Sequence, residues 1–239
     1  MRKEDVIFVS PSCKSDQMES HVHGDESSNK ITSTLSQLEI ARKNVIDASS
    51  LLDKKNRSSP AEHISISYVY EPLNKLVNML LPHLKFEIVD ISDTESPKCI
   101  FNKDTQSGFS HPTNHVDIDK LSRGEIEVIC QFLPLVEHQI LRKLVPRSDE
   151  RPISNIVVLM DMPGLYLQPQ LQSRLIDYVR SVVKEENENI QFIIVTNSSA
   201  LIDKATTEEL FMLMPSQQVA DRYNQLLKIS DPNMCLVRF

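Results

Sequence analysis

Two short motifs in the second half of the sequence carry residues that could position a charged ligand. Asp161 ends the apolar run NIVVLMD (155–161), which is typical of a strand buried on both faces of a parallel sheet. A carboxylate at the carboxyl end of such a strand lies where open α/β sheets bind their ligands. Ser122 and Glu125 form the S-x-x-E pattern of a capping box, in which each side chain hydrogen-bonds the other's backbone at a helix start. A strand end and a helix start are therefore the first places to look for a site.

The elements that must hold these motifs follow from hydrophobic periodicity. We expect a helix over 121–145, a strand over 155–161, a helix over 170–186 and a second buried strand within 187–199. Strand, helix and strand at this spacing form a crossover between parallel strands. The expected fold class is therefore α/β, with a mainly parallel sheet and flanking helices.

The first half of the chain is less regular. Its expected elements are a strand at 4–10, a polar loop over 12–34, helices over 31–52 and 61–83, paired strands at 85–91 and 98–103, and a polar loop over 104–120. Pro72 is expected to lie early in the second helix or to mark its true start. The expected organisation is a strand and polar loop (1–30), a helical arm with a small β element (31–115) and a C-terminal lobe (116–239).

Composition excludes several classes of protein. With 26 Lys and Arg against 33 Asp and Glu, the net charge of −7 disfavours nucleic-acid wrapping through bulk electrostatics. No apolar run approaches the roughly 18 residues of a membrane span, and the N-terminus has no signal-peptide core. The four cysteines form no CxxC pair, so neither a disulfide scaffold nor a zinc site is expected. We therefore expect an intracellular, cytoplasmic protein without a membrane segment.

Glycine is scarce, and this limits phosphate binding. The chain has 4 glycines, at positions 24, 108, 124 and 164, and no two lie close together. Neither a GxxxxGK[ST] phosphate loop nor a GxGxxG turn can be formed from them. The chain therefore carries no Walker A motif of its own.

The order of motifs resembles a known family. LSRGE, an apolar strand ending in aspartate, the segment PGLYLQPQLQ and a strand ending in TNS resemble the C-terminal half of an ABC-class P-loop ATPase. The nearest resemblance is to the RecF/OLD/SMC-like "AAA" ATPases, and it covers residues 115–205 approximately. It implies ATP binding and hydrolysis as the ancestral activity, with ATP and Mg²⁺ as cofactors.

The resemblance also assigns roles to individual residues. The signature motif, which would meet the γ-phosphate held by an opposite subunit, corresponds to Leu121, Ser122, Arg123, Gly124 and Glu125. Backbone N–H groups and the positive end of a helix dipole favour phosphate at such a helix start. Asp161 matches the Walker B aspartate, which helps to hold Mg²⁺ beside the phosphates.

Two positions depart from the family pattern. Met162 stands where the family has the glutamate that acts as general base, and a thioether cannot accept that proton. Asn197 replaces the switch histidine and cannot change charge near neutral pH. Together with the missing Walker A motif, these substitutions predict that the chain alone does not hydrolyse ATP.

Three hypotheses remain at this stage. The chain could be the C-terminal half of an ATPase whose N-terminal lobe is missing, through an upstream exon, a split gene or a lost segment. It could instead be a pseudo-ATPase interaction module or a degenerate gene product. The resemblance implies a head-to-tail homodimer or a partner ATPase lobe, with DNA as a possible further partner. Lys54, Lys55 and Arg57 form a small basic cluster that is a weak candidate for a phosphate or nucleic-acid contact.

Overall fold

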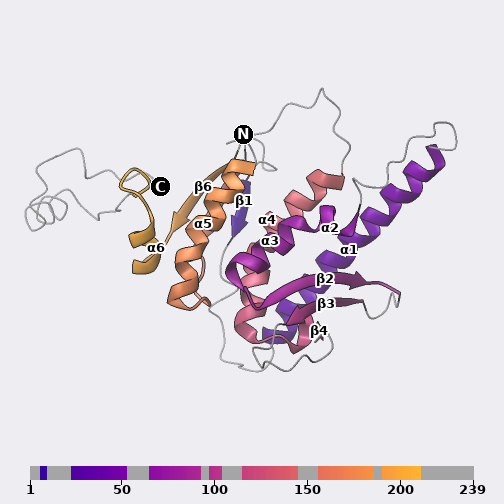
Figure 1. The fold of residues 1–239 in the computed structure, drawn as a ribbon, viewed down its shortest axis with the longest axis horizontal. Helices are drawn as coiled ribbons and strands as arrows, with labels where there is room; N and C mark the ends of the chain where they lie inside the picture. Colours follow the sequence, from indigo (N-terminus) through magenta and orange to yellow (C-terminus); the bar gives the residue numbers. More distant parts are fainter. Residues whose placement is uncertain are drawn as a thin grey trace, which may run out of the picture.

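A computed structural model provides the structure of the chain (Figure 1). It describes residues 6–9, 23–52, 65–92, 97–103, 115–144, 156–185 and 190–210. The basic cluster at 54–57 lies outside the described residues. Among those described, no helix is both long enough and apolar enough to cross a membrane.

A three-stranded parallel sheet occupies one side of the described structure. Its strand order is β1 (Val6–Val9), β5 (Ile156–Asp161) and β6 (Ile190–Val195), with β5 in the centre. Both neighbours of β5 pair with it in parallel register. The helix α5 (Pro169–Glu185) connects β5 to β6, which is the predicted crossover. The α/β fold class is confirmed.

One face of this sheet is more deeply buried than the other. On the buried face lie the side chains of Ile7, Val9, Ile156, Val158, Met160 and Ile190. α4 (Arg123–Leu144) contacts β1, and α5 contacts β6. On the opposite face Phe8 is 58% exposed and Val195 is 48% exposed. Val157 and Leu159 of β5 are half-buried on that face, so the predicted burial of β5 is complete on one face and partial on the other.

A second, antiparallel sheet lies on the other side of α4 from β1 (Figure 1). β2 (Leu84–Asp90) pairs with β3 (Lys98–Lys103), which confirms the predicted strand pair. β3 also pairs with β4 (His115–Asp117), and a short 3-10 helix, η3 (Ile118–Lys120), follows. A loop was predicted over 104–120, so β4 and η3 correct that expectation. A three-residue strand is too short to show hydrophobic periodicity, so β4 is recognised as a strand through its pairing with β3.

The longest helix begins earlier than predicted. α1 spans His23–Leu52, whereas a polar loop was expected over 12–34. Ser27 and Ser28 are buried, and the Ser27 hydroxyl donates to Glu127 Oε1 on α4 at 3.2 Å. Packing against α4 therefore favours a helix in a segment whose composition is typical of a loop. The last turns of α1 extend beyond the rest of the described chain (Figure 1).

The helix predicted over 61–83 is interrupted. α2 (Ile66–Val69) and α3 (Glu71–Leu80) meet at Tyr70, and Pro72 lies in the first turn of α3. Proline lacks an N–H and fits the first turn of a helix, where that donor has no intrahelical partner. Pro72 therefore marks the start of α3, which is one of the two expected outcomes.

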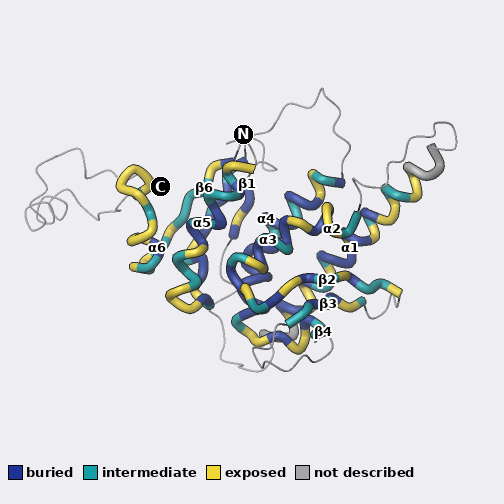
Figure 2. The backbone as a smooth tube through the Cα atoms, in the orientation of Figure 1, coloured by how far each residue is buried: buried dark blue, intermediate teal, exposed yellow. Residues whose placement is uncertain are grey.

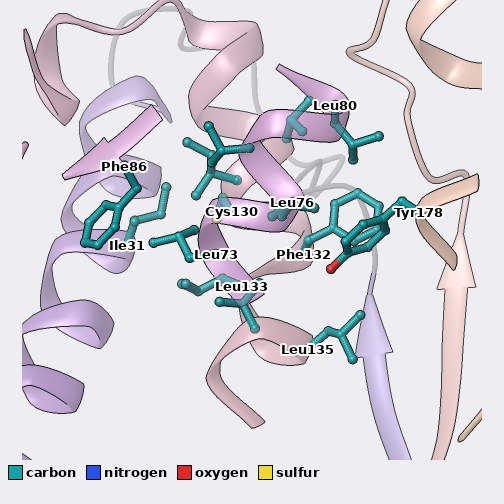
Figure 3. Packing of buried hydrophobic residues seen from close by; sticks show 14 of the residues in the cluster. Ile31, Leu73, Leu76, Leu80, Phe86, Cys130, Phe132, Leu133, Leu135 and Tyr178 are labelled. Carbon is teal, nitrogen blue, oxygen red and sulfur yellow. The ribbon is translucent and has the colours of Figure 1, made fainter. Parts of the chain in front are cut away.

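The core is centred on α4, which contacts α1, α3 and β1. Figure 2 shows the buried segments gathered along α3 and α4, whereas α6 (Ser199–Lys204) is mostly exposed. Phe132 of α4 packs edge-to-face on Tyr178 of α5, with ring centroids 5.8 Å apart (Figure 3). α4 thus joins the parallel sheet, α1 and the antiparallel sheet into one core.

Candidate functional site

The carboxyl edge of the parallel sheet brings two of the predicted residues to the same side. Asp161, the last residue of β5, is exposed and lies opposite Val195 of β6 in the strand register. Asn197 follows two residues after Val195 and is also exposed. Met162, next to Asp161, donates its backbone N–H to the Val195 carbonyl oxygen at 2.8 Å. Asp161 and Asn197, two of the residues singled out in the sequence, therefore lie at or just beyond the ends of adjacent strands at one sheet edge.

The turn that follows Asp161 is tied down by side chains from neighbouring elements. We call residues 162–167 the β5 turn. Gln172 of α5 donates from Nε2 to the carbonyl oxygens of Gly164 and Leu167, at 3.2 and 3.0 Å. Ser198, beyond β6, donates its hydroxyl to Gln172 Oε1 at 2.6 Å. Gln172 therefore links the β5 turn to the segment that carries Asn197.

The β5 turn contains two residues with positive φ. Gly164 has φ 77°, and Met162 has φ 46°. Glycine adopts this conformation without steric cost, whereas a non-glycine residue there is held against a preference of about 1–3 kcal/mol. The strained residue, Met162, directly follows the exposed carboxylate of Asp161. Its backbone is therefore fixed by the surroundings of the turn rather than by its own preference.

The predicted capping box is present at the start of α4. The Ser122 backbone N–H donates to Glu125 Oε2 at 2.6 Å, and the Glu125 backbone N–H donates to the Ser122 hydroxyl at 3.4 Å. Ser122 and Arg123 are exposed, so the helix start faces solvent. Leu121 is 6% exposed and belongs to the core, so its side chain is a packing residue rather than a ligand contact.

Glu125 has two further partners that sequence reasoning missed. Lys103 Nζ, at the end of β3, lies 3.0 and 3.1 Å from the two Glu125 carboxylate oxygens. His83 Nε2, in the turn before β2, hydrogen-bonds Glu125 Oε1. Burial acts to raise the pKa of Glu125, but the hydrogen bonds from His83, Lys103 and Ser122 outweigh it and lower the pKa to about 2. No spacing rule in the sequence links positions 83, 103 and 125, because the fold alone brings them together.

The start of α4 and the β5 turn are adjacent. A Cβ atom placed on Gly124 would lie 3.6 Å from the backbone oxygen of Tyr166. Farther along the same helix, Gln131 Oε1 accepts a hydrogen bond from the Gly164 backbone N–H at 3.3 Å. The two motifs singled out in the sequence therefore form one continuous region of the structure.

A nucleotide and its metal ion would find few ligands among the described residues. Among them, no group of three or more His, Cys, Asp or Glu side chains could hold a metal ion. Mg²⁺ is commonly held by one carboxylate together with substrate phosphates and water, so Asp161 alone fits that limited role. The sequence has no glycine-rich loop to hold the phosphates. ATP binding would therefore need a phosphate cradle from another lobe.

Comparison with known proteins gives no independent assignment. No family model matches the chain, and comparison with curated proteins found no similar sequence. What the sequence and the structure define is an α/β protein with a capped helix start beside the carboxyl edge of a parallel sheet.

Proposed function

We propose that the chain is an ABC-class ATPase-like domain that does not hydrolyse ATP alone and works with a partner lobe in trans. In this role the start of α4 meets the phosphates of ATP that is held by the Walker A loop of the partner. Asp161 would contribute a carboxylate to Mg²⁺ at the other end of the same region. The bound nucleotide would supply the phosphate charge that draws the two lobes together.

The observation that carries this proposal is the contact between the start of α4 and the β5 turn. The backbone oxygen of Tyr166 lies 3.6 Å from the Cβ position of Gly124. Ser122 and Arg123 are exposed beside this contact, and Leu165 in the turn is 52% exposed. The positive end of the α4 dipole favours anions at this helix start, although the capping box occupies the N–H groups of Ser122 and Glu125. An exposed leucine in the adjacent turn offers apolar contact area. Phosphate recognition and protein docking can therefore share one surface.

The residue types at the sheet edge favour a non-hydrolysing role. Met162 offers no proton acceptor, and Asn197 is neutral at every physiological pH. Both side chains follow strands whose scaffold is intact, because β5 and β6 remain paired up to Asp161 and Val195. The chemistry has changed while the positions have been kept, which fits an interaction role better than a catalytic one.

The test is nucleotide-dependent capture of a partner by the immobilised chain. We expect the wild-type chain to retain a protein that contains GxxxxGK[ST] when Mg²⁺ and a non-hydrolysable ATP analogue are present, and not in their absence. Ser122→Asp should abolish this retention, because aspartate still caps the helix while its negative charge repels the phosphates. Asn78→Asp, which adds the same charge at an exposed position on α3, should leave it intact.

Three results would contradict the proposal. Retention that does not depend on the nucleotide, retention that survives Ser122→Asp, or capture only of proteins without a Walker A motif would each exclude the role in trans.

A further inference from the structure

Gln131 is a buried polar residue at the contact between α4 and the β5 turn. It is 2% exposed, and its Oε1 accepts the Gly164 backbone N–H at 3.3 Å. Its Nε2 has no hydrogen-bond partner among the described residues. A buried donor without a partner is destabilising, so this side chain is not explained by stability alone.

Gln131 and Gly124 lie on the same face of α4. They are seven residues apart, which is about two helical turns and returns to nearly the same direction. Gly124 faces the Tyr166 carbonyl, and Gln131 binds Gly164. The β5 turn therefore contacts one rigid helix at two points, one at the exposed helix start and one in the core.

The other end of the β5 turn is held under strain. Met162 has φ 46°, and its N–H is bound to the Val195 carbonyl oxygen at 2.8 Å. The strained Met162 backbone lies at the start of this turn, and Gln131, with its unpaired donor, binds the turn at Gly164.

We infer that Gln131 is a positioning residue that couples the β5 turn, and with it Asp161, to the exposed start of α4. A movement of the β5 turn is transmitted through Gln131 to Ser122 and Gly124. Because coupling is reciprocal, a partner that binds the start of α4 changes the position of the turn. This inference stands independently of the proposed function, because it concerns the free chain and needs no nucleotide.

The test is residue-resolved hydrogen exchange of the free protein carrying Gln131→Met. Methionine keeps the approximate shape of glutamine but cannot accept the Gly164 N–H. We expect exchange about tenfold faster at Gly164 and measurably faster at Glu125 and Ile126 in the first turns of α4. Exchange at Ile140 and at Val179 should be unchanged.

Two variants separate coupling from a general loss of stability. Gln139→Met removes another buried amide from α4, at a residue that is 7% exposed, and should leave the exchange at Gly164 unchanged. Gln131→Glu retains an oxygen acceptor for the Gly164 N–H and should restore slow exchange at Gly164, Glu125 and Ile126.

A reciprocal experiment approaches the coupling from the helix start. Gly124→Val places a side chain against the Tyr166 carbonyl oxygen and should accelerate hydrogen exchange at Gly164. Combined with Gln131→Met, it should add less than the sum of the two single effects. If Gln131→Met does not fold, the coupling is tested by Gly124→Val alone. Unchanged exchange at Gly164 in Gly124→Val would then overturn the coupling. The coupling is also overturned if Gln131→Met accelerates hydrogen exchange at Gly164 alone, or to the same extent at all amides.

Discussion

At the scale of single residues, Glu125 has two structural roles. It caps α4 through the Ser122 backbone, and it pairs with Lys103 on the antiparallel sheet. Its side chain is 7% exposed, so the ionised form depends on these donors to replace water. Removing the charge would leave Lys103 without its partner and loosen the contact between β3 and the helix start.

Glu125→Gln should therefore destabilise the protein at neutral pH, by about 1–3 kcal/mol. The pKa of Glu125 is lowered to about 2 in the folded chain from the model-compound value of 4.5. The stabilisation is complete above pH 4.5 and is lost as the pH falls toward 2, because the unfolded chain then binds the proton first. Urea denaturation at pH 7 and at pH 3 should show a smaller difference between wild type and variant at pH 3.

An exposed carboxylate provides the control for this prediction. Glu71 pairs with Lys143 and is 59% exposed, so Glu71→Gln should change the free energy of unfolding by less than about 1 kcal/mol. An equal loss of stability in the two variants at pH 7, or a Glu125→Gln difference that does not shrink at pH 3, would contradict the role given to Glu125.

At the scale of elements, an aromatic pair in the core joins α4 to α5. Phe132 and Tyr178 pack edge-to-face in the core, and Tyr178 is 0% exposed. The Tyr178 hydroxyl makes no hydrogen bond in the described structure. This interface is therefore held by apolar packing, and the hydroxyl works against it.

Tyr178→Phe should keep the fold and raise the free energy of unfolding by up to about 1 kcal/mol, because the unpaired hydroxyl is removed while the ring stays. Tyr70→Phe is the matched control. The Tyr70 hydroxyl donates to Glu39 Oε2 at 3.1 Å, so its removal should destabilise the protein by about 1–2 kcal/mol. Chemical denaturation of both variants measures whether the free energy of unfolding rises or falls in each. A fall in Tyr178→Phe would show that the Tyr178 hydroxyl has a hydrogen-bond partner.

At the scale of the whole molecule, the helices cover the parallel sheet unequally. α4 and α5 contact its strands on the buried face, whereas Phe8, Val195 and Val6 remain exposed on the other. Parallel sheets normally have both faces covered. Among the described residues, the sheet is therefore covered more fully on one face than on the other.

The whole chain is expected not to bind ATP alone. Without a glycine-rich loop, millimolar Mg²⁺-ATP should shift the thermal unfolding midpoint by no more than about 1 °C relative to Mg²⁺ alone. Differential scanning fluorimetry would measure this, with Mg²⁺ and inorganic phosphate as the ionic control. A rise of several degrees that is specific to ATP would show that the chain holds nucleotide without a partner.

The local features of the site follow from sequence alone. The S-x-x-E pattern predicted the reciprocal bonds of Ser122 and Glu125, and the apolar run before Asp161 predicted a strand that ends there. Both signals are local, because capping and strand burial involve residues that are neighbours along the chain. The βαβ order then followed from spacing, since the crossover between parallel strands needs a helix of that length.

Other features depended on tertiary contacts. The helix at 23–34, with its buried Ser27, is defined by packing against α4, and β4 is defined by its pairing with β3. The partners of Glu125 and the hydrogen bond between Gln131 and Gly164 join residues with no regular spacing. Local propensity cannot encode such pairings, because their free energy exists only once distant segments are brought together. The sequence by itself thus determined where the chemistry-bearing residues lie, and only the tertiary structure decided which of them act on one another.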